Sequence, residues 1–147
     1  MTVAASVRPE RRQRTNQLIE ELQKERREVW SLYCQVAELK PFTAIETLRP
    51  KLTQFSQLLV DYVSLGHFGV YERVLAGTER RDRVLSVAKA IYPEFSTTTE
   101  AAISFNDKYD KVDKIEQFDA LEQDLSDLGE WLAKRIDLED KLCELMR

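Results

Sequence analysis

A chain of 147 residues with 43% hydrophobic side chains is long enough to form one domain with its own core, without a metal or a disulfide. Four glycines and four prolines leave few hairpin turns, which argues against a sheet and favours helices throughout. No uncharged stretch approaches the roughly 20 residues of a membrane span, and no apolar segment follows the N-terminal arginines as in an export signal. We therefore expect a cytoplasmic protein with a single domain over residues 1–147, of which residues 1–8 form a flexible arm.

The net charge of -4 is unevenly distributed along the chain. Residues 100–147 carry 14 acidic and 7 basic side chains, whereas the first 99 residues have a net positive charge. Because nucleic-acid binding relies on clustered Lys and Arg, an acidic C-terminal third argues against it and suits a basic protein partner. A solvated acidic face without a partner fits the composition equally well.

The first long helix is expected to start near Pro9, since proline suits the first helical turn, and to end before Pro41. Its apolar stripe consists of Leu18, Leu22, Val29, Tyr33 and Val36. Glu25 and Arg26 interrupt this stripe. Arg26 is expected either to lay its aliphatic part on the core or to make a polar contact there.

Thr43 and Glu46 have the spacing of a capping box, which predicts a short helical turn before Pro50. A second main helix should begin near Pro50, because apolar residues then repeat at steps of three and four. The repeat consists of Leu52, Phe55, Leu59 and Tyr62. Gly66 follows where a larger side chain would be expected, with Gly69 soon after, so we expect a break or kink in the helix here or the close approach of a neighbouring backbone.

A third helix is expected to end at Tyr92 and Pro93, because the residue before a proline disfavours helical geometry. Its apolar residues are Val84, Val87, Ala88 and Ile91. Residues 96–99 would then supply caps for a separate segment. The apolar face of that segment consists of Ala102, Phe105 and Tyr109.

The final helix has the clearest pattern, with alternating steps of three and four over about four heptads. Its stripe consists of Phe118, Leu121, Leu125, Leu128, Leu132, Arg135, Glu139, Leu142 and Met146. Together these elements predict an all-α, antiparallel helical bundle with four main helices and short helical connections.

Ionisable side chains occupy inward or boundary positions on several of these helices. They are Arg26, Asp61, His67, Glu72, Arg135 and Glu139. Buried charges persist only when they are paired, hydrogen-bonded or open to a cavity, so we expect a polar network or a cleft inside the bundle. A network that only fixes helix register and a cleft used in binding both fit the sequence.

Asp61, Ser64 and His67 are spaced three apart, as if a hydrolase triad were placed on one helix. Groups stacked along one helical side point outward in parallel and supply no oxyanion hole, so we do not expect an enzyme. With one His and no C-x-x-C pair, the usual ligand spacings for zinc or di-iron are missing, and we expect no metal and no cofactor. Cys34 and Cys143 are expected to be buried or half-buried thiols rather than a disulfide.

Three aromatic residues lie close to Asp61 in the sequence. Tyr62 fits a core position, whereas Phe68 and Tyr71 are better placed to be exposed anchors. Aromatic anchors flanked by carboxylates suit a helical partner with an apolar and basic face. The residues alone therefore indicate an interaction module.

The segment of residues 59–75, LVDYVSLGHFGVYERVL, contains the pattern LVDYxSxGHFxxYE. This pattern resembles the signature of the bacterial Rsd/AlgQ family, the regulators of sigma D. The residues that carry the resemblance are Asp61, Tyr62, Ser64, Gly66, His67, Phe68, Tyr71 and Glu72. Weaker resemblances are carried by Leu18, Ile19, Glu25 and Arg26 near the start and by Arg135, Leu138, Glu139, Asp140 and Leu142 near the end. The chain departs from the family where Glu21 and Leu22 replace an expected Arg and Trp, and where it stops at Arg147 with little C-terminal tail.

This resemblance implies an anti-sigma factor, a transcription regulator that binds the C-terminal, promoter-recognising domain of the primary sigma factor. It would block the association of that factor with core RNA polymerase and promoter, and so favour alternative sigma factors in stressed or stationary-phase cells. The expected partner-binding residues are Asp61, Ser64, Phe68, Tyr71 and Glu72, and the expected supporting polar network consists of Arg26, Tyr62, His67, Arg135 and Glu139. We expect a monomer that binds neither nucleic acid nor membrane. The alternative is a helical adaptor that binds another cytoplasmic regulatory protein without catalysis.

Overall fold

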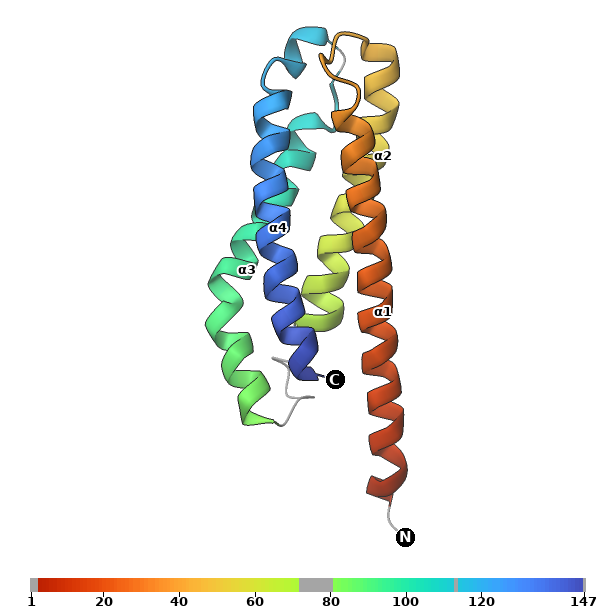
Figure 1. Ribbon diagram of the computed structural model, residues 1–147, viewed down its shortest axis with the longest axis vertical. Helices are drawn as coiled ribbons and strands as arrows, with labels where there is room; N and C mark the ends of the chain where they lie inside the picture. Colours follow the sequence, from red (N-terminus) through yellow and green to blue (C-terminus); the bar gives the residue numbers. More distant parts are fainter. Residues whose placement is uncertain (1–2, 72–80, 113, 147) are drawn as a thin grey trace.

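The computed structural model describes the backbone of residues 3–71, 81–112 and 114–146, and side chains from residue 13 onward except those of residues 70 and 71. Within these ranges, four long helices form an up-and-down bundle (Figure 1): α1 (Val3–Ala37), α2 (Ile45–Ser64), α3 (Asp82–Tyr109) and α4 (Leu121–Met146). A π-helical segment, η1 (Leu65–Tyr71), continues α2, and a 3-10 turn, η3 (Ile115–Phe118), precedes α4. The all-α bundle expected from the sequence is therefore confirmed.

The core lies between the four helices, where α1 packs on α2, α2 on α3 and α3 on α4. Its fully buried large residues include Phe55, Leu59, Tyr62, Phe95, Leu121 and Leu125. The first and last helices are also joined, because the Tyr33 hydroxyl donates a hydrogen bond to the Leu125 carbonyl oxygen at 2.8 Å. Each buried Leu or Phe contributes about 1.5–3 kcal/mol, so this apolar interior can support a few costly polar groups.

The first helix begins at Val3, before the start expected at Pro9. Residues 3–8 contain good helix formers and no glycine, so one proline does not stop the helix there. Figure 1 shows the N-terminal end of α1 extending beyond the other three helices. The flexibility of residues 1–8 stays a prediction. The buried stripe of α1 is also slightly rotated from the one expected, since Ile19 and Leu32 are buried and Leu18 is only partly so.

The capping box expected at Thr43 and Glu46 is wrong. The N-cap of α2 is Ala44, which makes no side-chain capping bond, and the helix passes through Pro50. Leu48 and Leu52 are both buried, so the apolar stripe continues across the proline. Pro50 itself is exposed in the second turn of α2, so the packing of the buried stripe on the other side of the helix offsets its missing N–H bond.

The helix end expected at Tyr92 and Pro93 is also wrong, because α3 continues through both residues. Pro93 is exposed, and the stripe of buried side chains runs past it. The residues expected to cap a new helix instead donate hydrogen bonds back within α3. Thr97 Oγ1 donates to the Pro93 carbonyl at 3.0 Å and Thr98 Oγ1 donates to the Phe95 carbonyl at 2.6 Å.

The final stripe is confirmed over most of its length, although α4 itself begins at Leu121 and Phe118 lies in η3. Every expected stripe residue from Phe118 to Leu142 is buried, including the charged pair Arg135 and Glu139. Cys143 is a buried free thiol, whereas Cys34 is exposed, which corrects the expectation for that residue. No helix in the described part of the chain has the length and apolar character needed to cross a membrane.

Candidate functional site

The last turns of α2 and the start of η1 present a mixed polar and aromatic surface, which we call the α2–η1 face and define as Asp61, Ser64 and Phe68. Asp61 is exposed, Ser64 is half-buried and the Phe68 side chain is 63% exposed. An exposed phenylalanine is poorly hydrated, so covering it would stabilise a complex by about 1.5–3 kcal/mol. The Tyr71 side chain and Glu72, which were expected beside these residues, lie outside the described part of the structure.

An aromatic cluster extends this face onto α3. The His67 ring lies 5.0 Å from the Phe68 ring and 6.3 Å from the Tyr92 ring, measured between centroids. Tyr92 is 40% exposed. The sequence does not indicate Tyr92 as part of this surface, because the following Pro93 predicts a helix end and hides the position of Tyr92 within one long helix.

Acidic side chains border the face on the α1 side. Glu25 is half-buried, and its Oε2 atom is buried without a hydrogen-bond partner among the described residues. Burial raises the pKa of Glu25, and the neighbouring charges of Glu21 and Asp61 raise it further. Two carboxylates that repel each other across the α1–α2 seam would be stabilised by a cation from outside.

The change from α-helix to π-helix coincides with a close approach between η1 and α4. A Cβ atom on Gly66 would lie 2.7 Å from Arg135 Nη2 and 3.1 Å from Glu139 Oε2, so only glycine leaves room for this buried pair. Arg135 Nη2 also donates to the Val63 carbonyl oxygen at 3.0 Å. π-helical turns shift the backbone hydrogen-bond register and are frequent at functional sites. The helix therefore changes type near Gly66 without ending, and the close neighbour of this glycine is the Arg135 side chain rather than another backbone.

Arg135 is the centre of a buried polar network, with a side chain that is 0% exposed. Its Nε donates to Glu139 Oε2 at 3.0 Å, and its Nη1 donates to Thr99 Oγ1 at 2.6 Å and Thr98 Oγ1 at 3.3 Å. The Tyr62 hydroxyl donates a short hydrogen bond to Glu139 Oε1. Three helices, α2, α3 and α4, thus share one ion pair.

The fourth helix joins through Arg26. Its Nη1 lies 3.6 Å from Glu139 Oε1 and donates to Asp140 Oδ1 at 2.9 Å. Burial opposes the charged form of Arg26, but the hydrogen bond and the charge of Asp140 outweigh it and raise the pKa of Arg26. This resolves the alternatives for Arg26 in favour of a polar contact.

Burial sets the proton affinities inside the network. It raises the pKa of Glu139, against the opposing effects of Arg135, Tyr62 and Arg26. It also raises the pKa of Tyr62, as does the negative charge of Glu139 beside the hydroxyl. Tyr62 therefore stays a neutral donor, which is the form that Glu139 requires.

The expected network residues Arg26, Tyr62, Arg135 and Glu139 are brought into direct contact. His67 is linked to them through Phe95: its ring stacks on Phe95 at 6.1 Å, and the Arg135 guanidinium lies 4.1 Å from the same ring. The additional members are Thr98, Thr99 and Asp140. A threonine in a helix interior gives no sequence signal of this kind, because its hydroxyl can equally bond to its own helix. Support of a partner-binding face by this network stays a prediction.

The arrangement is suited to holding a surface in one conformation. Among the described residues, no group of three or more His, Cys, Asp and Glu side chains is placed to hold a metal ion. The ionisable groups of the network point at one another. On the α2–η1 face, the exposed carboxylate of Asp61 lies one to two helical turns from the exposed ring of Phe68. Such a surface can bind a polypeptide that carries a cation beside an apolar side chain.

Comparisons with known proteins place the chain among regulators of a protein partner. The family described as "Regulator of RNA polymerase sigma(70) subunit, Rsd/AlgQ" matches residues 1–147. A protein named Regulator of sigma D from Yersinia enterocolitica is 34% identical over 137 residues, which cover 88% of this chain and 80% of the relative. Proteins of the same name from Yersinia pseudotuberculosis serotype O:1b and Enterobacter sp. (strain 638) are 33% and 34% identical, cover 88% and 89% of this chain, and are covered over 79% and 81% of their own lengths. No solved structure matches the chain.

Proposed function

The chain belongs to the Rsd/AlgQ family, and from this premise we propose that it is an anti-sigma factor that binds the primary sigma factor of RNA polymerase. The bound segment is the C-terminal, promoter-recognising domain of the sigma factor. Holding that domain keeps it from core polymerase and from the promoter, and so favours alternative sigma factors. The protein acts as a cytoplasmic monomer, without catalysis and without binding nucleic acid itself.

The observation that supports this proposal best is the exposure of Asp61 and Phe68 on one face, above the buried hydrogen-bond network of Arg135. A DNA-reading helix-turn-helix domain presents basic residues to phosphate, so a carboxylate can take the place of the phosphate. The partly buried carboxyl of Glu25 next to Asp61 strengthens the negative potential at this point. Phe68 supplies an exposed apolar anchor, and its burial in a complex would contribute affinity. Charges at the rim of an interface contribute mainly to the orientation and rate of binding.

The buried network supports the proposal in a different way. The α2–η1 face lies on a helix whose hydrogen-bond register changes at Leu65, and such a segment is held in one conformation only if its neighbours fix it. Arg135 binds the backbone of this segment at Val63 and is itself bound to α3 and α4. A preorganised surface loses less entropy on binding.

A binding assay with the isolated C-terminal domain of the primary sigma factor tests the proposal. The Asp61→Asn variant removes one exposed charge and should weaken binding by about tenfold, with little change in melting temperature. Asp137→Asn is the matched control, since Asp137 is also exposed but lies on α4. If the wild-type protein does not bind the sigma domain, the functional class is wrong and the chain is an adaptor for another protein. If both variants bind like the wild type, Asp61 is the wrong residue.

A further inference from the structure

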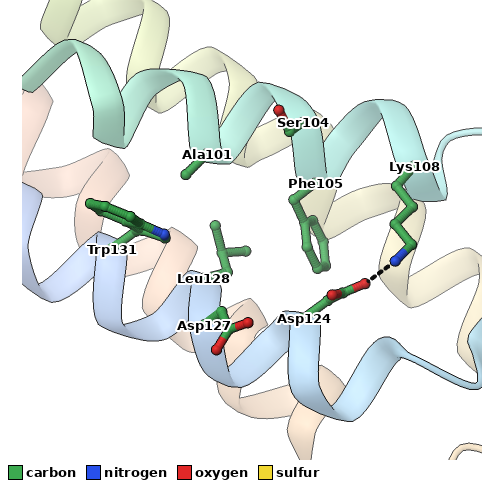
Figure 2. A pocket seen from close by; sticks show the side chains of 8 residues that line it. All are labelled: Ala101, Ser104, Phe105, Lys108, Asp124, Asp127, Leu128 and Trp131. Carbon is green, nitrogen blue, oxygen red and sulfur yellow. Dashed lines mark hydrogen bonds and ion pairs between the residues drawn. The ribbon is translucent and has the colours of Figure 1, made fainter.

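A surface groove lies between helices α3 and α4, and no described residue of α2 or η1 lines it. Figure 2 shows this groove, whose apolar floor is formed by Ala101, Phe105 and Leu128. Trp131 stands at one end, and Lys108 and Asp124 stand at the other. Asp127 lies at the α4 wall between these two ends.

The size of the groove limits what can occupy it. Its volume is about 220 Å³, which is below the roughly 300–1,000 Å³ of pockets that hold cofactors and metabolites. A space of this size accommodates one long side chain with an apolar neighbour. The groove therefore fits part of a polypeptide better than a free small molecule.

Charge determines which side chain fits. Residues 115–133 contain six acidic side chains and no basic one. Within the groove, Asp124 is already neutralised, because Lys108 Nζ donates to its Oδ2 at 2.6 Å and Tyr109 also donates to it. Asp127 is exposed and accepts a hydrogen bond at 2.9 Å from Nε2 of the uncharged Gln123 to its Oδ1. Among the described residues, no ion pair compensates the negative charge of Asp127 beside the apolar floor.

Trp131 already has one cation of its own helix beside its ring. Lys134 Nζ lies 5.5 Å from the centre of the indole ring, and its own charge is paired with Glu94 at 3.0 Å. A second cation can use the indole and the carboxylate together, since an aromatic face and a carboxylate both favour a planar guanidinium. Arginine suits this site better than lysine because it can stack and bind a carboxylate at the same time.

We propose that the α3–α4 groove is a docking site for an arginine side chain, flanked by an apolar residue, on a helix of a partner protein. The guanidinium binds Asp127 Oδ2 and packs against Trp131, and the apolar neighbour covers Phe105 and Leu128. This site is separate from the α2–η1 face, so the protein can hold a second partner segment without releasing the first.

Heteronuclear NMR on the full-length protein tests this proposal with a capped leucine-arginine-leucine peptide as probe. The indole N–H signal of Trp131 should shift on titration with this peptide and should not shift with the peptide that has glutamate in place of arginine. The Asp127→Asn variant should weaken binding of the arginine peptide by about tenfold. The Asp137→Asn variant, which makes the same charge change on the same helix outside the groove, should bind it like the wild type.

Three results would overturn the proposal. The first is an equal shift of the Trp131 signal with both peptides, which would mean that only apolar contact matters. The second is a shift that depends on protein concentration without any peptide, which would place a second copy of this chain in the groove. The third is loss of binding to the sigma C-terminal domain in Asp127→Asn, because the two sites would then not be separate. Normal circular dichroism and melting of Asp127→Asn exclude misfolding as the cause of any loss.

Discussion

Gly66 lies against a buried ion pair, so a single added methyl group at this position should destabilise the protein. In Gly66→Ala the new Cβ would lie 2.7 Å from Arg135 Nη2 and 3.1 Å from Glu139 Oε2. Arg135 cannot move aside freely, because it is fully buried and bonded to Glu139, Thr99 and Val63. The clash must therefore displace either η1 or the ion pair.

The expected cost follows from these contacts. Overpacking a filled interior costs about 1–3 kcal/mol, and weakening one charge-assisted hydrogen bond adds about 1.5–3 kcal/mol if it is lost entirely. Replacing glycine by alanine in a helical segment returns up to about 1 kcal/mol. We therefore expect Gly66→Ala to lower the free energy of unfolding by about 2–4 kcal/mol in urea denaturation.

Gly69→Ala is the matched control, because it lies in the same π-helical segment. Its Cβ would meet only the Leu65 side chain, with Cδ1 at 3.0 Å and Cγ at 3.9 Å, and that flexible side chain can rotate away. Gly69→Ala should stay within about 1 kcal/mol of the wild type. If Gly66→Ala is as stable as Gly69→Ala, the close approach between η1 and Arg135 does not exist as described.

The remaining predictions concern the two polar clusters. Arg135→Met leaves the buried carboxylate of Glu139 without its main partner and should lower the free energy of unfolding in urea by about 3–5 kcal/mol. Adding Glu139→Leu should recover part of that loss, and a double variant less stable than the single one would refute this account of the pair. Tyr62→Phe removes one donor to Glu139 and should cost about 1–2 kcal/mol in the same assay, whereas unchanged stability would show that the hydroxyl is dispensable. The pKa of Asp124 is lowered: burial opposes the shift, but the hydrogen bond from Lys108 outweighs it. The stabilisation by the Asp124–Lys108 pair, under about 1 kcal/mol, is therefore complete above the unfolded-state pKa of about 3.9 and is lost as the pH falls through the lower folded-state pKa. Melting curves of Asp124→Asn should accordingly converge with those of the wild type at acidic pH, and a constant gap would contradict the assignment.

The helical bundle could be predicted from the sequence because the apolar residues repeat at helical spacing over long stretches. The expected boundaries at Pro50 and Pro93 were wrong for one physical reason. Each proline is exposed and lies between buried residues of a continuous stripe, so the packing gained by continuing the helix outweighs one missing N–H bond. The sequence shows that a proline is present, but it does not show whether the buried side chains on either side of the proline pack against the same neighbouring helices.

The candidate site could be predicted in part. Arg135 and Glu139 are recognisable because two charges four residues apart interrupt a leucine stripe, and charges at such positions must be paired. Their partners on α3 could not be predicted, since Thr98 and Thr99 take part only because the helix continues past Pro93. The exposure of Tyr92 next to His67 depends on the same continuation.

The central claim is that the α2–η1 face is covered when the sigma factor is bound, and thiol labelling measures this directly. Ser64→Cys introduces one thiol on the face, in a Cys34→Ser background that removes the exposed native thiol and leaves Cys143 buried. The labelling rate of residue 64 should fall at least about tenfold when the sigma C-terminal domain is added in excess. A labelling rate that stays the same while the complex is shown to form would contradict the claim.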